Sequence, residues 1–205
     1  MDSLESRNLF KECGVIFPLD CLSVGDCVLF RKEVSIILTL CENRRLCMLG
    51  YAKGHQLAAA LMSSEYIYSL VQTHTEWSSV RLTECGISIK APYSKRQNVW
   101  HTDGAARIHG GHLVALWISI APARRDSGFI FLSELSNFLD IKRLPMPRHP
   151  HHVNDEEQVQ RKIIRVPLKT GQAVLFDCNN PHANLQNYSA SARSGVLGFF
   201  TKDLT

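Results

Sequence analysis

The stretch Trp100-His101-Thr102-Asp103 decides the predicted fold, together with the distant pair Pro181-His182. In an extended segment, residues i and i+2 point to the same side, so His101 and Asp103 offer an imidazole and a carboxylate to one point in space. A second imidazole from His182 would complete the set. Two histidines and one carboxylate on one face of an octahedron leave three positions open, which suits ferrous iron that also takes a co-substrate and dioxygen. The three residues therefore predict a redox metal site.

Arg193 follows His182 by eleven residues, just before the apolar segment 195–200. A guanidinium that points into a β-barrel needs an anion, and its planar fork matches a carboxylate with two parallel hydrogen bonds. A dicarboxylate co-substrate would satisfy both the metal and Arg193.

These residues resemble the motifs of the phytanoyl-CoA dioxygenase (PhyH-like) family of iron(II)/2-oxoglutarate-dependent oxygenases. The resemblance extends from Phe10 to nearly the C-terminus. Its motifs are Trp100-His101-Thr102-Asp103, Ala115-Leu116-Trp117-Ile118, Asp126-Ser127-Gly128, and Pro181-His182 with Asn187, Ser189 and Arg193. It implies a mainly β fold, a double-stranded β-helix of the jelly-roll or cupin-like kind with flanking N-terminal helices. It also implies an enzyme that uses Fe(II), 2-oxoglutarate and O2 and releases succinate and CO2.

The resemblance also implies the site residues. The metal ligands, which are the catalytic residues, fall on His101, Asp103 and His182. The residues implied for 2-oxoglutarate are Arg193, Trp117, Ser189 and Asn184. Asp103 argues against halogenation, because related halogenases replace this carboxylate with a small residue.

Composition indicates one domain with a hydrophobic core and no cluster of basic residues for binding nucleic acid. The chain has 205 residues, 45% of them hydrophobic, and a formal net charge of +4 from basic residues that are spread along it. Seven cysteines without a CxxC pair fit a reduced compartment. We see neither a signal peptide, a membrane span nor a peroxisomal tripeptide, so the expected location is cytoplasmic.

We expect a single PhyH-like domain over 1–205, with a mostly helical buttress in 1–80 and the β-helix core with the metal site in 81–205. The buttress is predicted to contain a strand over 14–18 that Pro18 ends, and helices over 23–40 and 56–71. In the core, alternating or apolar runs predict strands over 84–90, 113–120, 129–132, 162–166, 173–176 and 195–200. The turn signal Asp126-Ser127-Gly128 predicts a hairpin that leads into the strand 129–132.

Several polar residues near these motifs have a plain interpretation. Lys90 at a strand end is interpreted as solvated rather than as a partner for a carboxylate in the site. The segments 104–112 and 133–160 carry His109, His112 and the cluster His149, His151 and His152. We interpret these as pocket-wall or solvated imidazoles rather than as a second metal site.

Alternatives remain open for the activity, the substrate and the partners. The rival functions are a cupin-like metal isomerase or thiol-type dioxygenase, and a non-catalytic partner subunit of a heteromeric oxygenase. Hydroxylation is the default reaction, and desaturation, cyclisation and epimerisation are the open alternatives. A small natural-product or amino-acid-type metabolite is preferred over an acyl-CoA, and a homo- or heterodimer could complete the pocket wall. An acyl-CoA would need a basic groove, gathered from Lys95, Arg96, Arg124, Arg125, Lys142 and Arg143.

Overall fold

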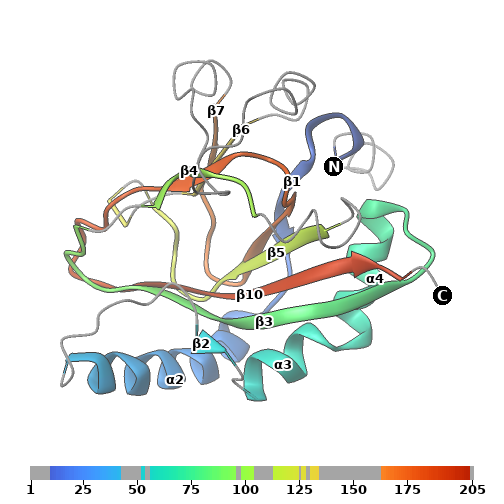
Figure 1. The fold of residues 1–205 in the computed structure, drawn as a ribbon. Helices are drawn as coiled ribbons and strands as arrows, with labels where there is room; N and C mark the ends of the chain where they lie inside the picture. The colour runs from blue at the N-terminus through green and yellow to red at the C-terminus, as the bar shows by residue number, and fades with distance from the viewer. Residues whose placement is uncertain are drawn as a thin grey trace.

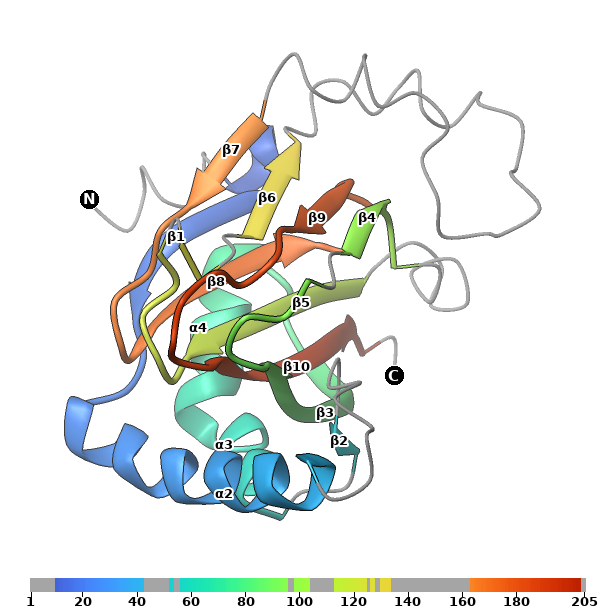
Figure 2. The same cartoon turned by 90° about the vertical axis from the view of Figure 1, so that its left-hand side faces the viewer.

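Two antiparallel sheets stacked face to face form the body of the protein (Figures 1 and 2). The computed structural model describes residues 10–42, 52–53, 56–95, 98–103, 113–124, 126–127, 130–133 and 163–203. The histidines in 104–112 and 133–160, predicted to be pocket-wall or solvated imidazoles, lie outside these residues.

Each sheet mixes strands from distant parts of the sequence. The six-stranded sheet has the order β1 (Val15–Asp20), β8 (Gln172–Asp177), β5 (Leu113–Ser119), β10 (Arg193–Lys202), β3 (Val80–Lys90), β2 (Ala52–Lys53). The four-stranded sheet has the order β4 (Asn98–His101), β9 (His182–Asn184), β6 (Ile130–Ser133), β7 (Ile163–Val166). This arrangement confirms the predicted mainly β fold, and strands appear where the apolar runs placed them.

Helices cover the outer face of the six-stranded sheet (Figure 1). They are α2 (Val24–Glu42), α3 (Gln56–Met62) and α4 (Glu65–Thr75). The predicted helix over 56–71 is wrong as one element, because Ser64 adopts an extended conformation and its side chain accepts a hydrogen bond from the backbone N–H of Ile67. Ser64 therefore caps a new helix instead of continuing the old one. None of the described helices is long and apolar enough to cross a membrane.

Strand β5 separates two apolar cores. All seven of its residues are buried, as its continuous apolar run predicts for a strand covered on both faces. Leu116 and Ile118 pack toward the helices, whereas Ala115 and Trp117 pack into the space between the sheets. The alternation along β5 thus defines an outer, helix-facing side and an inner side that lines the barrel.

Strand β1 continues through Pro18 to Asp20, so the prediction that Pro18 ends it is wrong. β1 lies at the edge of the six-stranded sheet, and its pairing with β8 shifts register between Ile16 and Leu19. A proline, which cannot donate a backbone hydrogen bond, is tolerated at an edge and beside such an irregularity.

The predicted hairpin around Asp126 and Ser127 is also wrong. β5 belongs to the six-stranded sheet and β6 to the four-stranded one, so the connection crosses between the sheets. Ala123 forms an isolated bridge with Leu168 on the way. Ser127 does stabilise a turn, because its hydroxyl accepts a hydrogen bond from the backbone N–H of Arg124 at 2.8 Å. The local turn signal is therefore real, but it does not determine which strands pair.

Candidate active site

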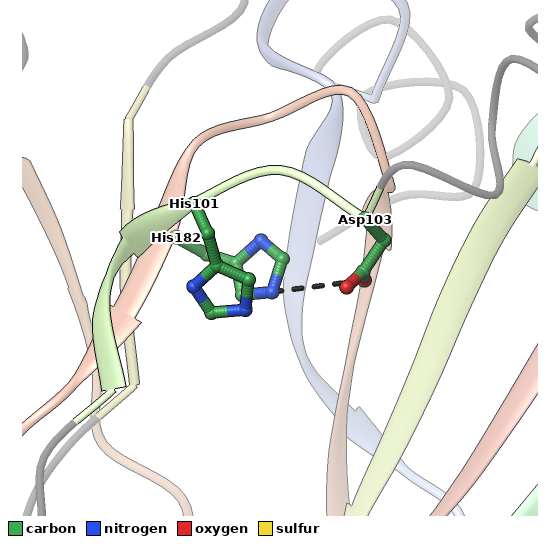
Figure 3. Close-up of side chains that lie close together, drawn as sticks. All are labelled: His101, Asp103 and His182. Carbon is green, nitrogen blue, oxygen red and sulfur yellow. Dashed lines mark ion pairs between the residues drawn. The ribbon is translucent and has the colours of Figure 1, made fainter. Parts of the chain in front are cut away.

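His101, Asp103 and His182 lie together at the ends of two paired strands (Figure 3). His101 ends β4, His182 begins β9, and the two are directly opposite one another in the ladder. Their ring centroids are 4.2 Å apart. Asp103 Oδ2 lies 3.6 Å from His182 Nε2, and one donor atom from each of the three residues lies within 4.8 Å of the others. The two-residue spacing of His101 and Asp103 therefore places both side chains close to the same position, as predicted.

Backbone groups of the turn between β8 and β9 orient two of these side chains. The backbone N–H of Asp103 donates to Cys178 O at 3.0 Å. His182 Nδ1 lies 3.0 Å from Asn180 O. Because a carbonyl oxygen can only accept, Nδ1 carries a proton, and in the neutral imidazole Nε2, which faces Asp103, then offers its lone pair. This is the tautomer that a metal-binding histidine needs.

The chemistry of the donor set fits Fe(II). Two imidazoles and a carboxylate are the facial set found in non-haem iron oxygenases. The thiol of Cys178 is fully buried, and burial together with the charge and a hydrogen bond of Asp103 raises its pKa well above the usual value. Cys178 is therefore a neutral thiol in the metal-free chain. The His182 and Asp103 side chains are only 12% and 24% exposed, so the set is sheltered but reachable.

Arg193 lies on the inner side of the barrel at the start of β10, as its predicted place on the next strand requires. The residue is only 4% exposed, and its guanidinium carbon lies 5.5 Å from the centre of the Trp117 ring. Burial lowers the pKa of Arg193 to about 10, which still leaves it a cation at neutral pH. Trp117 is both a core residue and the wall beside this charge.

Lys90 is the residue whose predicted environment is wrong. It is 8% exposed and directly opposite Arg193 in the β3–β10 ladder, so both side chains project to the inner side. Its ammonium group donates to Asn184 Oδ1 and to the backbone carbonyl of Leu185. The alternation of β3, with Ile87 and Ile89 packed toward the helices, is the signal that could have placed Lys90 inside.

The two polar residues predicted to assist the co-substrate differ in position. Asn184 lies on β9, two residues after His182 and therefore on the same side of the strand, and binds Lys90. Ser189 lies in the loop before β10, where its hydroxyl donates to Asn187 Oδ1 at 2.7 Å. Asn187 is buried and also donates to the carbonyls of Lys90 and Ala91. In the described contacts Ser189 stabilises this loop, and its role toward a co-substrate stays a prediction.

The fold and this site define the class of protein, a double-stranded β-helix that can hold a metal ion with two histidines and a carboxylate. Residues 55–195 match the model of the phytanoyl-CoA dioxygenase (PhyH) family, and the chain belongs to this family. It is accordingly an Fe(II)/2-oxoglutarate-dependent oxygenase, with Fe(II), 2-oxoglutarate and O2 as its cofactors and co-substrates. Comparison with curated proteins gives no match.

Solved structures share the fold at low sequence identity. AviO1 from Streptomyces viridochromogenes Tue57 is 16% identical with a TM-score of 0.76, over 100% of this chain and 96% of that one. The epimerase SnoN in complex with Fe3+, alpha ketoglutarate and nogalamycin RO is 15% identical with a TM-score of 0.75, over 98% and 83% of the chains. EctD from S. alaskensis with 2-oxoglutarate and 5-hydroxyectoine is 16% identical with a TM-score of 0.74, over 98% and 76%. These likenesses confirm the fold.

Proposed function

We propose that this chain oxidises a C–H bond of a small metabolite, by default through hydroxylation, with His101, Asp103 and His182 as the iron ligands. The observation that carries the proposal is the common location of the three donor groups and the buried Arg193 inside one barrel. The donor set alone would fit several metal enzymes. A buried cation on the inner side of the same barrel favours one that also binds an anionic co-substrate.

The residues around the metal site have different roles in binding the metal and in orienting its ligands. Fe(II) held there would supply the oxidising chemistry, in which 2-oxoglutarate and O2 give succinate, CO2 and an oxidised C–H bond. His182 would bind through Nε2, because its Nδ1 is engaged by Asn180 O. Asp103 supplies the anionic ligand, and its backbone is held by Cys178 O. Phe176, whose ring centre lies 5.1 Å from that of His182, packs against this imidazole and limits its rotation.

Lys90 and Arg193 would bind the carboxylate of 2-oxoglutarate that is remote from the metal. Both cations are buried and face the same inner side, so each is in a medium of low polarity where attraction to an anion is strong. Burial disfavours the charged form of Arg193, as its lowered pKa records, and a bound carboxylate would offset that cost. Trp117 would form the flat wall of this pocket.

A natural-product or amino-acid-type substrate is the class we propose. Two structures of the same fold are named for complexes with nogalamycin RO and with 5-hydroxyectoine, which are small molecules without a CoA group. An acyl-CoA would need a cluster of phosphate-binding cations. Four of the six basic residues considered for that groove, Arg96, Arg125, Lys142 and Arg143, lie outside the described residues, so the substrate panel below tests this alternative.

The proposal is tested by O2-dependent formation of succinate from 2-oxoglutarate with the Fe(II)-loaded protein, over a panel of small metabolites and acyl-CoA thioesters. We expect the parent to form succinate, and His101→Ala and Arg193→Ala to lose at least about 100-fold, because each removes a charge-assisted contact of roughly 3 kcal/mol or more. Arg165→Ala, which removes an exposed arginine on β7, is the matched control and should retain activity. Stimulation by acyl-CoA alone would replace the proposed substrate class. Bound iron without succinate would favour the isomerase or the partner subunit.

A further inference from the structure

The turn between β8 and β9 carries contacts to two of the three donor residues, and we infer that Asn180 is the positioning residue that holds this turn in place. The inference rests on the proposed function, since it takes His101, Asp103 and His182 as the metal ligands. It concerns a side chain that donates to backbone carbonyls rather than to a donor group of the site, and that acts through the position of the turn.

Two carbonyl groups of the turn set the geometry of the donor residues. Cys178 O accepts from the backbone N–H of Asp103 at 3.0 Å, and Asn180 O accepts from His182 Nδ1 at 3.0 Å. The first contact fixes the backbone from which the carboxylate projects. The second fixes the plane and the tautomer of the imidazole. A shift of the turn therefore moves both donor groups at once.

The side chain of Asn180 ties the turn to the chain segment before β1. The residue is 0% exposed, and its Nδ2 donates to Cys13 O at 3.0 Å and to Gly14 O at 3.2 Å. The backbone N–H of Asp177 donates to Gly14 O at 2.8 Å. The turn is thus held to this N-terminal segment through Asp177, the last residue of β8, and through Asn180, whose carbonyl contacts His182.

The two N–H groups are the part of the carboxamide that matters. Its Oδ1 is buried and has no hydrogen-bond partner among the described residues. Asn180→Asp therefore keeps the shape but removes both donors, and it places a carboxylate against two carbonyl oxygens. Asn180→Ala removes the anchor but leaves the backbone carbonyl that His182 uses. An effect of Asn180→Ala on the metal must therefore be transmitted through the position of the turn.

A neighbouring residue offers a matched control. Asn179 lies in the same turn, and its carboxamide donates to Oδ1 of Asp177, the last residue of β8, at 2.9 Å. Asn179→Ala therefore makes the same chemical change one position away. Asn180→Ser keeps a short hydroxyl donor at the original position and tests partial rescue.

The experiment measures the affinity of the metal-free full chain for Co(II) by its visible absorption at 10 °C, with circular dichroism to verify folding. We expect Asn180→Ala and Asn180→Asp to bind Co(II) about 10- to 100-fold more weakly, the range usual for groups that orient metal ligands, and to alter the spectrum of the bound ion. Asn180→Ser should fall between these variants and the parent. Asn179→Ala should bind like the parent, and His101→Ala should bind hardly at all.

The outcomes separate this inference from the proposed function. A parent chain that binds no Co(II), or a His101→Ala variant that binds it normally, would overturn the metal site itself. A parent that binds, with Asn180 variants of equal affinity and spectrum, would overturn the inference alone. A purely structural role would lower the melting temperature of the metal-free Asn180 variants without changing the increase that Co(II) produces, and that result also counts against the inference.

Discussion

Gly195 allows the Trp117 ring to lie flat against β10, and its replacement tests the geometry of the co-substrate pocket. A Cβ added at Gly195 would lie 2.3 Å from Trp117 Cε2, 2.4 Å from Cζ2 and 2.6 Å from Nε1. Ordinary contact begins near 3.4 Å, so Gly195→Ala forces the ring or the strand to move by about 1.1 Å. Trp117 is 3% exposed and adjoins Arg193, so the buried ring cannot move without disturbing the cationic wall.

Gly195→Ala should affect both stability and co-substrate binding. Overpacking a buried core costs about 1 to 3 kcal/mol, which urea unfolding of the metal-free chain would measure. The displaced ring should also weaken 2-oxoglutarate binding by about tenfold, equivalent to about 1.4 kcal/mol. This is measured by titrating 2-oxoglutarate into the Co(II)-loaded protein. In the Gly195→Ala background, Trp117→Phe replaces the indole with a smaller ring and should recover part of the lost stability and part of the lost 2-oxoglutarate affinity.

Gly198→Ala is the control on the opposite side of the same strand. Its Cβ would meet Met62 Sδ at 2.8 Å, in the core beneath the helices and away from the site. We expect a loss of stability with unchanged 2-oxoglutarate affinity. The reasoning is refuted if Gly195→Ala is as stable as the parent and binds 2-oxoglutarate equally well, or if Gly198→Ala weakens binding as much.

Three further changes have defined outcomes. Lys90→Met leaves Asn184 Oδ1 without its donor, so the free energy of unfolding should fall by roughly 1 to 3 kcal/mol in urea, and the 2-oxoglutarate dissociation constant of the Co(II)-loaded protein should rise. Burial raises the pKa of Cys21 from 9.0 to about 12, so the native state favours the neutral thiol. The contribution of the neutral Cys21 thiol to the free energy of unfolding is complete below pH 9 and is lost between pH 9 and about 12, by up to about 1.4 kcal/mol per pH unit. Cys21→Ala should therefore flatten the plot of unfolding free energy against pH over that range, as measured by urea unfolding. Ser64→Ala removes the cap of α4 and should cost about 1 kcal/mol by thermal unfolding.

Local spacing predicts where the candidate site residues lie. The positions of His101 and Asp103 follow from the period of a strand, and the structure brings them to His182. The buried strand β5 is predicted by a continuous apolar run, which is typical of a strand covered on both faces. Arg193 follows from its distance beyond His182. In each case the information lies within a dozen residues.

Features that depend on distant partners could not be predicted in this way. Lys90 is buried because Asn184 and the carbonyl of Leu185, more than ninety residues later, cover the end of β3. The turn at Ser127 forms as its residues predict, yet the neighbours of β5 are β8 and β10. Pro18 is tolerated because β1 happens to lie at a sheet edge. Sheet order decides all three, and no single stretch of sequence encodes it.

The central position of β10 determines when this protein can fold during its synthesis. β10 is the last of the described strands along the sequence, so it leaves the ribosome after β5 and β3, yet it lies between them and pairs with both. Until it emerges, the larger sheet is divided, and the apolar residues that α2 and α3 direct toward it have an incomplete surface to cover. Such distant pairings make folding slow and leave the nascent chain prone to association with other chains. Arg193 arrives with β10, so the strand that completes the sheet also delivers the cation of the proposed co-substrate pocket.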